Sequence, residues 1–257
     1  MANFSFTSRI TASTACFDQQ EYYHTVKVLR QKVGSTIRFL DGCGGVYRGT
    51  ISCIDPGKQT FEATIEETRQ SPPPRPAVTL AIALPKGKKF DIIVQKAVEL
   101  GIQRIIPLVS RYSMVKPGND REVARKHAQR QKTALEALKQ CGNPFLPELC
   151  LPLALTSLPA LADHRKIALV FDNHATTGIS SCTTLLAAAD EIIIIIGPEG
   201  GFAREEIIWL NSRGYRPVSL GSPILRLETA AIAAMAIIQY LNNYFQPVKN
   251  LQEIDLK

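Results

Sequence analysis

Short runs of alternating apolar and polar side chains occupy much of the first 70 residues. Three such runs span residues 35–41, 46–53 and 60–67, and clusters of Gly, Asp and Pro separate them. A period of two places alternate side chains on the same face of a strand, and the separating residue types favour turns. The pattern predicts a small antiparallel β-barrel, preceded by one helix over residues 21–30.

A run of prolines then interrupts the chain, at Pro72, Pro73, Pro74 and Pro76. Because each proline fixes its φ and lacks an N–H group, such a run continues neither a helix nor a β-ladder. We interpret it as a linker, and we expect one domain over residues 1–72 and a second over residues 73–257.

Beyond the linker, apolar runs typical of buried strands alternate with amphipathic stretches typical of helices. Strands are expected at residues 78–84, 104–109, 167–171, 192–196 and 217–220, and helices at 89–100, 120–140, 205–214 and 229–244. Asp120 is suited to cap the second helix, and Gly101 and Gly142 are suited to follow the ends of the first two. The alternation predicts an α/β domain with a mostly parallel sheet.

Composition adds a localised positive charge to this picture. The chain carries a formal net charge of +7. Residues 85–139 hold 13 Lys and Arg against 5 Asp and Glu, whereas residues 1–72 hold 8 against 7. A concentrated positive charge is typical of proteins that bind RNA or another polyanion, although a solvated basic helix produces the same count.

The cysteines and apolar runs indicate the compartment. The six cysteines form no CxxC pair and have no histidine at zinc-ligand spacing, so we expect free thiols and no metal site. No apolar run approaches the roughly 18 residues of a membrane span, and the first residues lack the apolar core of a signal peptide. We therefore expect a cytoplasmic protein with no membrane segment.

The segment after the strand at 192–196 is the first candidate for a ligand site. It contains Gly197, Pro198, Glu199, Gly200 and Gly201 and precedes a helix. Ligands of open α/β sheets bind at the carboxyl ends of strands, and glycine lets the backbone approach a ligand closely. The segment lacks both the GxGxxG pattern and the Lys-Ser/Thr of a phosphate-binding loop, and a purely structural turn would have the same composition.

A second junction of this kind spans residues 220–230. Arg226 and Glu228 stand there among apolar residues, where an ionised side chain is costly unless it is paired or functional. The simpler alternative is a structural ion pair between the two. Because both junctions join a strand to a helix, we expect them to line one pocket.

A third candidate is the lysine cluster around Gly87, at another junction between a strand and a helix. Lys86, Lys88 and Lys89 suit contacts with phosphate groups there, and a solvated helix start is the alternative.

Taken in their order, these segments resemble the RsmE family, the uridine-N3 methyltransferases of 16S ribosomal RNA in the SPOUT superfamily. The resemblance extends over nearly the whole chain, and residues 196–202, 220–230 and 95–101 carry its most specific motifs. In the front domain, Arg9-Ile10 and residues 24–30 and 39–42 match that family's PUA-like barrel. Three positions depart from the family pattern, namely Lys139, Asn143 and Leu227.

The resemblance implies a fold, a cofactor and partners. It implies a SPOUT domain with a deep trefoil knot behind the PUA-like β-barrel, and a homodimer in which each site lies near the partner chain. It also implies S-adenosyl-L-methionine as methyl donor and 16S rRNA of the small ribosomal subunit as substrate. The implied cofactor-binding residues are Leu169, Phe171, Ile196, Gly197, Pro198, Glu199, Gly200, Gly201, Leu220, Gly221, Ile224, Leu225, Leu227, Thr229 and Ala230.

We assign roles in the reaction from its chemistry. Loss of the proton at N3 spreads negative charge over the flanking carbonyl oxygens of uracil, and Arg226 is the first candidate to stabilise that charge. Glu228 would orient Arg226 or accept the proton. The residues expected to hold RNA are Arg9, His24, Arg30, Lys86, Lys88 and Lys89.

Three other functions share parts of these features. A non-catalytic RNA-binding or ribosome-assembly factor would have the basic stretch and the barrel without a donor pocket. A dinucleotide-dependent enzyme would have the α/β pattern, but it would need a GxGxxG sequence at the first strand. A SPOUT enzyme could also act on another RNA, which the match in the front domain disfavours.

Overall fold

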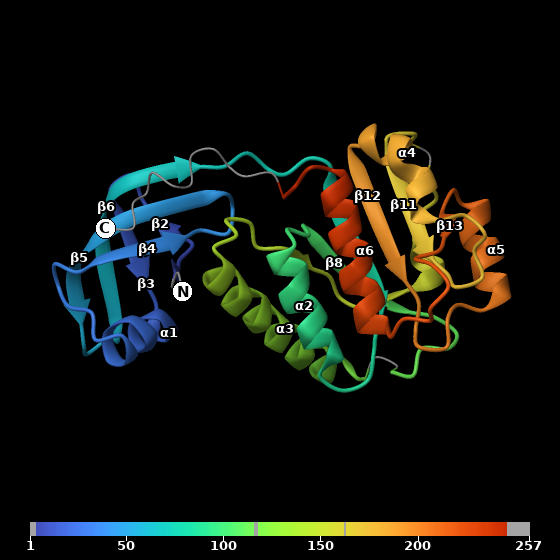
Figure 1. Cartoon of the computed structure of the whole chain (residues 1–257). Coiled ribbons are helices and arrows are strands. Elements are labelled where there is room, and N and C mark those ends of the chain that lie inside the picture. The colour runs from blue at the N-terminus through green and yellow to red at the C-terminus, as the bar shows by residue number, and fades with distance from the viewer. Residues whose placement is uncertain (1–3, 116–117, 162, 246–257) are drawn as a thin grey trace.

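The computed structural model describes residues 4–115, 118–161 and 163–245. These residues form two sheets, which the proline-rich segment joins (Figure 1). The first sheet and its helix lie at one end of the molecule, and the second sheet with most of the helices lies at the other.

The N-terminal sheet has six strands in the order β1-β4-β5-β6-β3-β2. All its pairs are antiparallel except β1 with β4. Three phenylalanine rings fill its core: Phe17 stacks on Phe61 at 4.3 Å and meets Phe39 edge-on at 5.2 Å. The strands are β1 (Ser5–Phe6), β2 (Arg9–Ile10), β3 (Thr14–Phe17), β4 (Thr36–Leu40), β5 (Gly45–Asp55) and β6 (Thr60–Gln70).

The predicted helix at residues 21–30 begins two residues earlier and changes type. The α-helix α1 (Gln19–Tyr22) continues directly into the π-helix η1 (Tyr23–Val28). The side chain of Asp18 caps α1, because it accepts hydrogen bonds from the N–H groups of Gln20 and Glu21, both at 3.0 Å. Asp18 follows directly after β3, and an aspartate at this position was the available signal for the start of the helix.

The second sheet confirms the predicted α/β domain, because all its pairs are parallel. Its strand order is β10-β8-β7-β12-β11-β13, and β9 pairs with β8. Two short strands and the short helices were not predicted. The strands are β7 (Ala77–Ala83), β8 (Arg104–Val109), β9 (Glu148–Leu149), β10 (Leu153–Ala154), β11 (Lys166–Phe171), β12 (Glu191–Ile196) and β13 (Arg216–Val218).

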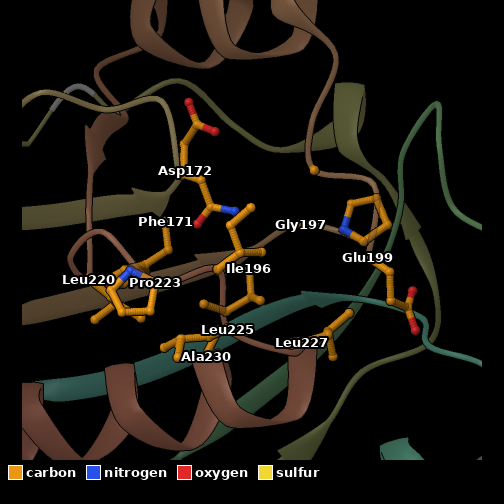
Figure 2. Close-up of a pocket in the computed structure, with 14 residues that line it drawn as sticks. Phe171, Asp172, Ile196, Gly197, Glu199, Leu220, Pro223, Leu225, Leu227 and Ala230 are labelled. Atoms are coloured by element: carbon orange, nitrogen blue, oxygen red, sulfur yellow. The ribbon is translucent and has the colours of Figure 1, made fainter.

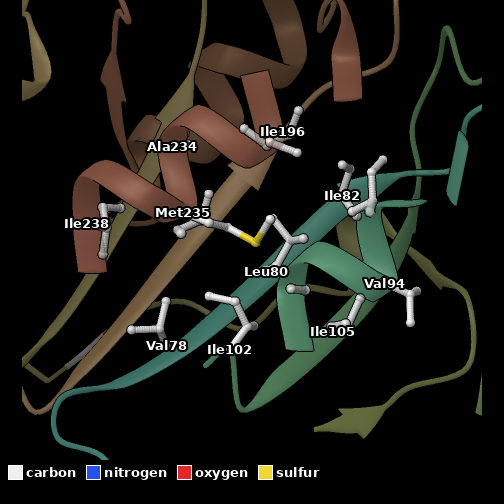
Figure 3. Packing of buried hydrophobic residues seen from close by; sticks show 14 of the residues in the cluster. Val78, Leu80, Ile82, Val94, Ile102, Ile105, Ile196, Ala234, Met235 and Ile238 are labelled. Atoms are coloured by element: carbon white, nitrogen blue, oxygen red, sulfur yellow. The ribbon is translucent and has the colours of Figure 1, made fainter. Parts of the chain in front are cut away.

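Helices cover both faces of this sheet (Figure 1). The core on one face joins residues of α2, α3, α4 and α6, and the core on the other face includes Leu210 of α5 and Tyr215. Figure 3 shows Met235 of α6 directed toward Leu80 of β7. Each fully buried side chain of this size stabilises the fold by about 1.5–3 kcal/mol. The helices are α2 (Lys89–Glu99), α3 (Asp120–Cys141), η2 (Leu155–Ser157), η3 (Ile179–Cys182), α4 (Thr183–Ala187), α5 (Arg204–Ser212) and α6 (Leu227–Leu241).

The ends of α3 test the predicted caps. Asn119, and not Asp120, is the N-cap, and its side chain accepts a hydrogen bond from the N–H of Glu122 at 3.0 Å. Asp120 instead lies in the first turn, where its charge favours the positive end of the helix dipole. Gly142 ends the helix at a φ of 75°, a left-handed conformation that glycine adopts without strain.

Within the described part of the chain, no helix combines the length and the apolar character needed to cross a membrane.

Candidate functional site

A pocket lies where β11 and β12 end and α6 begins (Figure 2). Segments that are far apart in the sequence meet there because parallel neighbouring strands end at the same edge of the sheet. Both glycine-containing junctions contribute to it, as their common strand-to-helix position predicts. The lining residues are Phe171, Asp172, Asn173, Ile196, Gly197, Pro198, Glu199, Gly201, Leu220, Pro223, Ile224, Leu225, Leu227 and Ala230.

The first junction is a tight turn after β12. The N–H of Gly201 donates to the carbonyl oxygen of Pro198 at 2.8 Å, and Gly201 has a φ of 72°. A Cβ on Gly197 would lie 3.0 Å from the ring of Phe202, so a side chain there would force that ring to move. Glycine is therefore needed for the turn itself at Gly201 and for close packing at Gly197.

The second junction is a loop that ends at the first turn of α6. The side-chain oxygen of Ser219 accepts a hydrogen bond from the N–H of Gly221 at 3.1 Å, and Gly221 has a φ of 118°. Ile224 is 81% exposed although its side chain is large and apolar. An exposed apolar side chain at the wall of a pocket is available to a ligand or to a partner chain.

Most of the residues expected to hold a cofactor line this pocket. Leu169 does not, because it is fully buried within β11. Gly200 faces a neighbouring groove, while Gly221 and Thr229 are exposed and lie outside the lining. Asp172 and Asn173 were missed, although both are polar residues directly after an apolar strand, which was the available signal, and Pro223 lies within the predicted 220–230 junction without having been singled out.

The alternative of a structural ion pair between Arg226 and Glu228 is not found among the described residues. Instead, Lys89 lies between two carboxylates: its Nζ is 3.4 Å from Oε1 of Glu199 and 3.4 Å from Oε2 of Glu228. Arg226 is exposed at the N-cap position of α6, next to the pocket. The structural-pair alternative for Arg226 and Glu228 is therefore wrong, because the charge of Glu228 is matched by a lysine from α2.

The surroundings of Glu228 keep its carboxylate ionised. Its own backbone N–H has the largest effect and lowers the pKa of Glu228 below its usual value. Partial burial opposes this change, while Lys89 and Arg226 add to it. The group is thus a carboxylate throughout the neutral range and available to accept a hydrogen bond, although the lowered pKa makes it a weaker proton acceptor.

The residues expected to contact RNA lie in two separate groups. Lys86 and Lys88 are exposed at the turn before α2, beside the pocket, whereas Lys89 is held by the two carboxylates. Arg9 in β2 and Arg30 after η1 are exposed, and His24 is half-buried in η1. The second group thus lies in the N-terminal sheet and the helix packed against it, at the other end of the molecule (Figure 1).

Two of the three departures from the family pattern have structural roles away from the pocket. Lys139 is buried and pairs with Glu21 at 2.9 Å and with Glu136 at 3.0 Å. Asn143 donates a hydrogen bond to the carbonyl oxygen of Val98 at 2.8 Å. Leu227, in contrast, lines the pocket itself.

The pocket is lined by backbone turns, apolar side chains, the amide of Asn173 and the carboxylates of Asp172 and Glu199. Glu199 pairs with Lys89, whereas no ion pair involves Asp172 within the described residues. In the part of the chain that the structure describes, no three His, Cys, Asp or Glu side chains are grouped to hold a metal ion. The arrangement suits an organic ligand with an apolar ring and polar edges.

Comparison with known proteins gives the class of this chain. Residues 72–239 match the family model of the RNA methyltransferase domain, which is more than half of the chain. The chain is an RNA methyltransferase.

Relatives across nearly the whole chain narrow the class to a family. Ribosomal RNA small subunit methyltransferase E of Synechocystis sp. is 32% identical over 91% of this chain and 75% of its own length. The protein of the same name from Rickettsia conorii is also 32% identical, over 88% of this chain and 90% of its own. This chain belongs to the ribosomal RNA small subunit methyltransferase E family.

Solved structures share the fold. A ribosomal RNA small subunit methyltransferase E from Neisseria gonorrhoeae, bound to S-adenosyl methionine, superposes with a TM-score of 0.82 at 24% identity, over 94% of this chain and 98% of that one. A methyltransferase of Legionella pneumophila in complex with the cofactor has a TM-score of 0.79 at 26% identity, over 93% and 96% of the two chains.

Proposed function

We propose that this protein transfers a methyl group from S-adenosyl-L-methionine to N3 of a uridine in 16S rRNA of the small ribosomal subunit. The observation that carries the proposal is the pocket formed by the 197–201 turn and the 220–225 loop, in a chain whose relatives are small-subunit rRNA methyltransferases. The uridine and its N3 position rest on the family resemblance of the sequence.

The residues of the pocket fit the donor. Ile196, Leu225 and Phe171 offer apolar walls to a flat ring, and the turns offer backbone N–H and carbonyl groups to its polar edge. The Asp172 carboxylate is suited to hydroxyl groups or to a positive charge. When bound, the donor supplies a methyl group attached to a positively charged sulfur. Once the methyl group is transferred, the sulfur keeps the bonding electrons and becomes a neutral thioether.

The charged residues beside the pocket fit the acceptor. As N3 of uracil loses its proton, negative charge develops on the neighbouring carbonyl oxygens, and the exposed guanidinium of Arg226 would stabilise it. The ionised carboxylate of Glu228 would orient Arg226 or accept the proton, and its lowered pKa favours the orienting role. Because N3 of a paired uracil is hydrogen-bonded, the base must reach the site unpaired.

The same family resemblance supports two domains with different functions. Residues 1–72 would be a PUA-like barrel that holds RNA through Arg9, His24 and Arg30, and residues 73–257 would be a knotted SPOUT domain. The knot rests on the family resemblance alone. The exposed Ile224 at the pocket wall supports a homodimer in which a partner chain covers it.

Methyl transfer to small ribosomal subunits that lack this modification tests the proposal. With labelled S-adenosyl-L-methionine, we expect label in 16S rRNA and, after digestion, N3-methyluridine as the product seen by mass spectrometry. Another methylated nucleoside would contradict the N3 assignment. Absence of transfer and of donor binding would contradict methyl transfer altogether and would favour an RNA-binding assembly factor.

A further inference from the structure

A second groove adjoins the donor pocket, and the function proposed above has so far assigned no ligand to it. Its lining residues are Lys86, Arg111, Tyr112, Ser113, Met114, Glu199 and Gly200. We propose that this groove is the acceptor site, in which the ring of Tyr112 stacks on the pyrimidine base that is methylated. The inference rests on the proposed methyl transfer to RNA and names the site where the base would lie.

The groove and the donor pocket share a wall. Glu199 lines both, while Gly197 and Pro198 line the pocket and Gly200 lines the groove. In Figure 2 the Glu199 side chain lies at the edge of the pocket away from Leu220. Reacting atoms must come within about 3–3.5 Å of one another, so an acceptor has to occupy a cavity that adjoins the donor pocket.

The backbone that carries Tyr112 is fixed on two sides. The side-chain oxygen of Ser113, a residue only 8% exposed, accepts a hydrogen bond from the N–H of Ser110 at 2.9 Å. The N–H of Arg111 donates to Oε1 of Glu206, in α5, at 2.8 Å. Hydrogen bonds thus hold the turn both internally and against α5. Because its backbone is already ordered, ligand binding would cost little further conformational entropy there.

The Tyr112 side chain is nevertheless open to solvent. It is 48% exposed, and Met114 beside it in the groove is 61% exposed. The Cβ of Tyr112 lies 3.8 Å from the position that a Cβ on Gly200 would occupy, so the tyrosine lies next to the glycine turn after β12. An exposed aromatic ring on a fixed backbone is the feature on which RNA-binding proteins stack unpaired bases.

The charges around the groove suit a nucleotide and not merely an apolar ring. Lys86 and Arg111 line it, and the Arg111 guanidinium lies 5.7 Å from the centre of the Tyr112 ring while pairing with Glu205 at 3.3 Å. Cations of this kind contact the phosphates that flank a stacked base. The carboxylate of Glu199 on the shared wall is offset by Lys89.

Two substitutions of Tyr112 distinguish the effect of its aromatic ring from the effects of side-chain size and apolar character. Tyr112→Phe keeps the ring, and Tyr112→Leu keeps an apolar side chain without a face for stacking. With small ribosomal subunits as substrate, we expect Tyr112→Phe to retain kcat/KM within about twofold and Tyr112→Leu to lose at least about tenfold, the effect of removing one stacking platform. Calorimetric titration should give the same S-adenosyl-L-methionine affinity for all three proteins, which also shows that they are folded.

Two results would overturn the inference: a Tyr112→Leu protein that transfers methyl groups as fast as the wild type, or one whose donor binding is weakened. The second result would place Tyr112 in the donor pocket. Failure of the wild-type protein to methylate the subunits would instead contradict the proposed function itself, so the two failures are distinguishable.

Discussion

At the scale of single residues, Lys89 determines how charge is distributed at the site. It lies 3.4 Å from carboxylate oxygens of both Glu199, which lines the pocket, and Glu228, which lies in the first turn of α6 beside it. Because Lys89 balances Glu228, the described structure leaves the exposed guanidinium of Arg226 outside any ion pair. Arg226 is thus available to meet the negative charge that develops on the acceptor.

Replacing Arg226 tests this role. We expect Arg226→Ala to lower kcat about 10²–10³-fold, the usual effect of removing a group that stabilises developing charge, while donor affinity stays unchanged. Arg165→Ala is the matched control, because Arg165 precedes β11 at the opposite edge of the sheet and pairs on the surface with Asp190. Equal turnover of the Arg226→Ala and Arg165→Ala proteins would rule out the assignment.

The sequence predicted which residues line the site better than it predicted which of them form ion pairs. Buried strands followed by glycine turns were visible in the pattern, so Gly197, Gly201 and Leu225 could be assigned to one pocket. The pairing of Glu228 with Lys89 was not visible, because the two lie far apart in the chain and meet only when α2 and α6 pack side by side. Neighbouring positions such as Arg226 and Glu228 suggested a local pair that the first turn of the helix does not form.

At the scale of helices, a buried ion pair joins α1, which packs on the N-terminal sheet, to α3, which packs on the second sheet. The Nζ of Lys139 is 2.9 Å from Oε1 of Glu21, and the two side chains are only 9% and 4% exposed. Burial tends to lower the pKa of Lys139, but Glu21 and Glu136 outweigh it and the pKa is raised. A raised lysine pKa contributes stability that is complete below the usual lysine value and is lost as the pH rises through the folded-state pKa.

Breaking this pair should destabilise the whole chain. Lys139→Met would leave the carboxylate of Glu21 buried without a cation, and we expect the free energy of unfolding in urea to fall by about 3–5 kcal/mol. Lys126→Met on the same helix removes an exposed pair with Glu122, which solvent screens, and should change the free energy of unfolding far less. The double variant Glu21→Leu/Lys139→Met should recover much of the loss, and equal effects of the two single lysine variants would contradict this account.

Element boundaries were predictable where the apolar pattern is long. β8 and β12 follow their apolar runs closely, and α3 follows the predicted span. The strands β1, β2, β9 and β10 have two residues each, which is too short for any periodicity to appear. The π-helix η1 escaped prediction as well, because its residues are equally compatible with an ordinary helix.

At the scale of the whole molecule, the order of the strands creates the pocket. β12 lies between β7 and β11, so its carboxyl end adjoins segments from the middle and the end of the chain. The sequence predicted a parallel sheet but not this order, because strands buried on both faces are similar apolar runs that could pair in several ways.

Titration of the protein with S-adenosyl-L-methionine tests most directly the central claim that this pocket holds the methyl donor. We expect the wild type to bind one equivalent per chain, and Ala230→Phe to bind none, because the larger side chain would fill the pocket from α6. Ala188→Phe is the matched control at an exposed position that does not line the pocket, and it should bind like the wild type. Undiminished binding by a folded Ala230→Phe protein, or no binding by the wild type, would contradict the account.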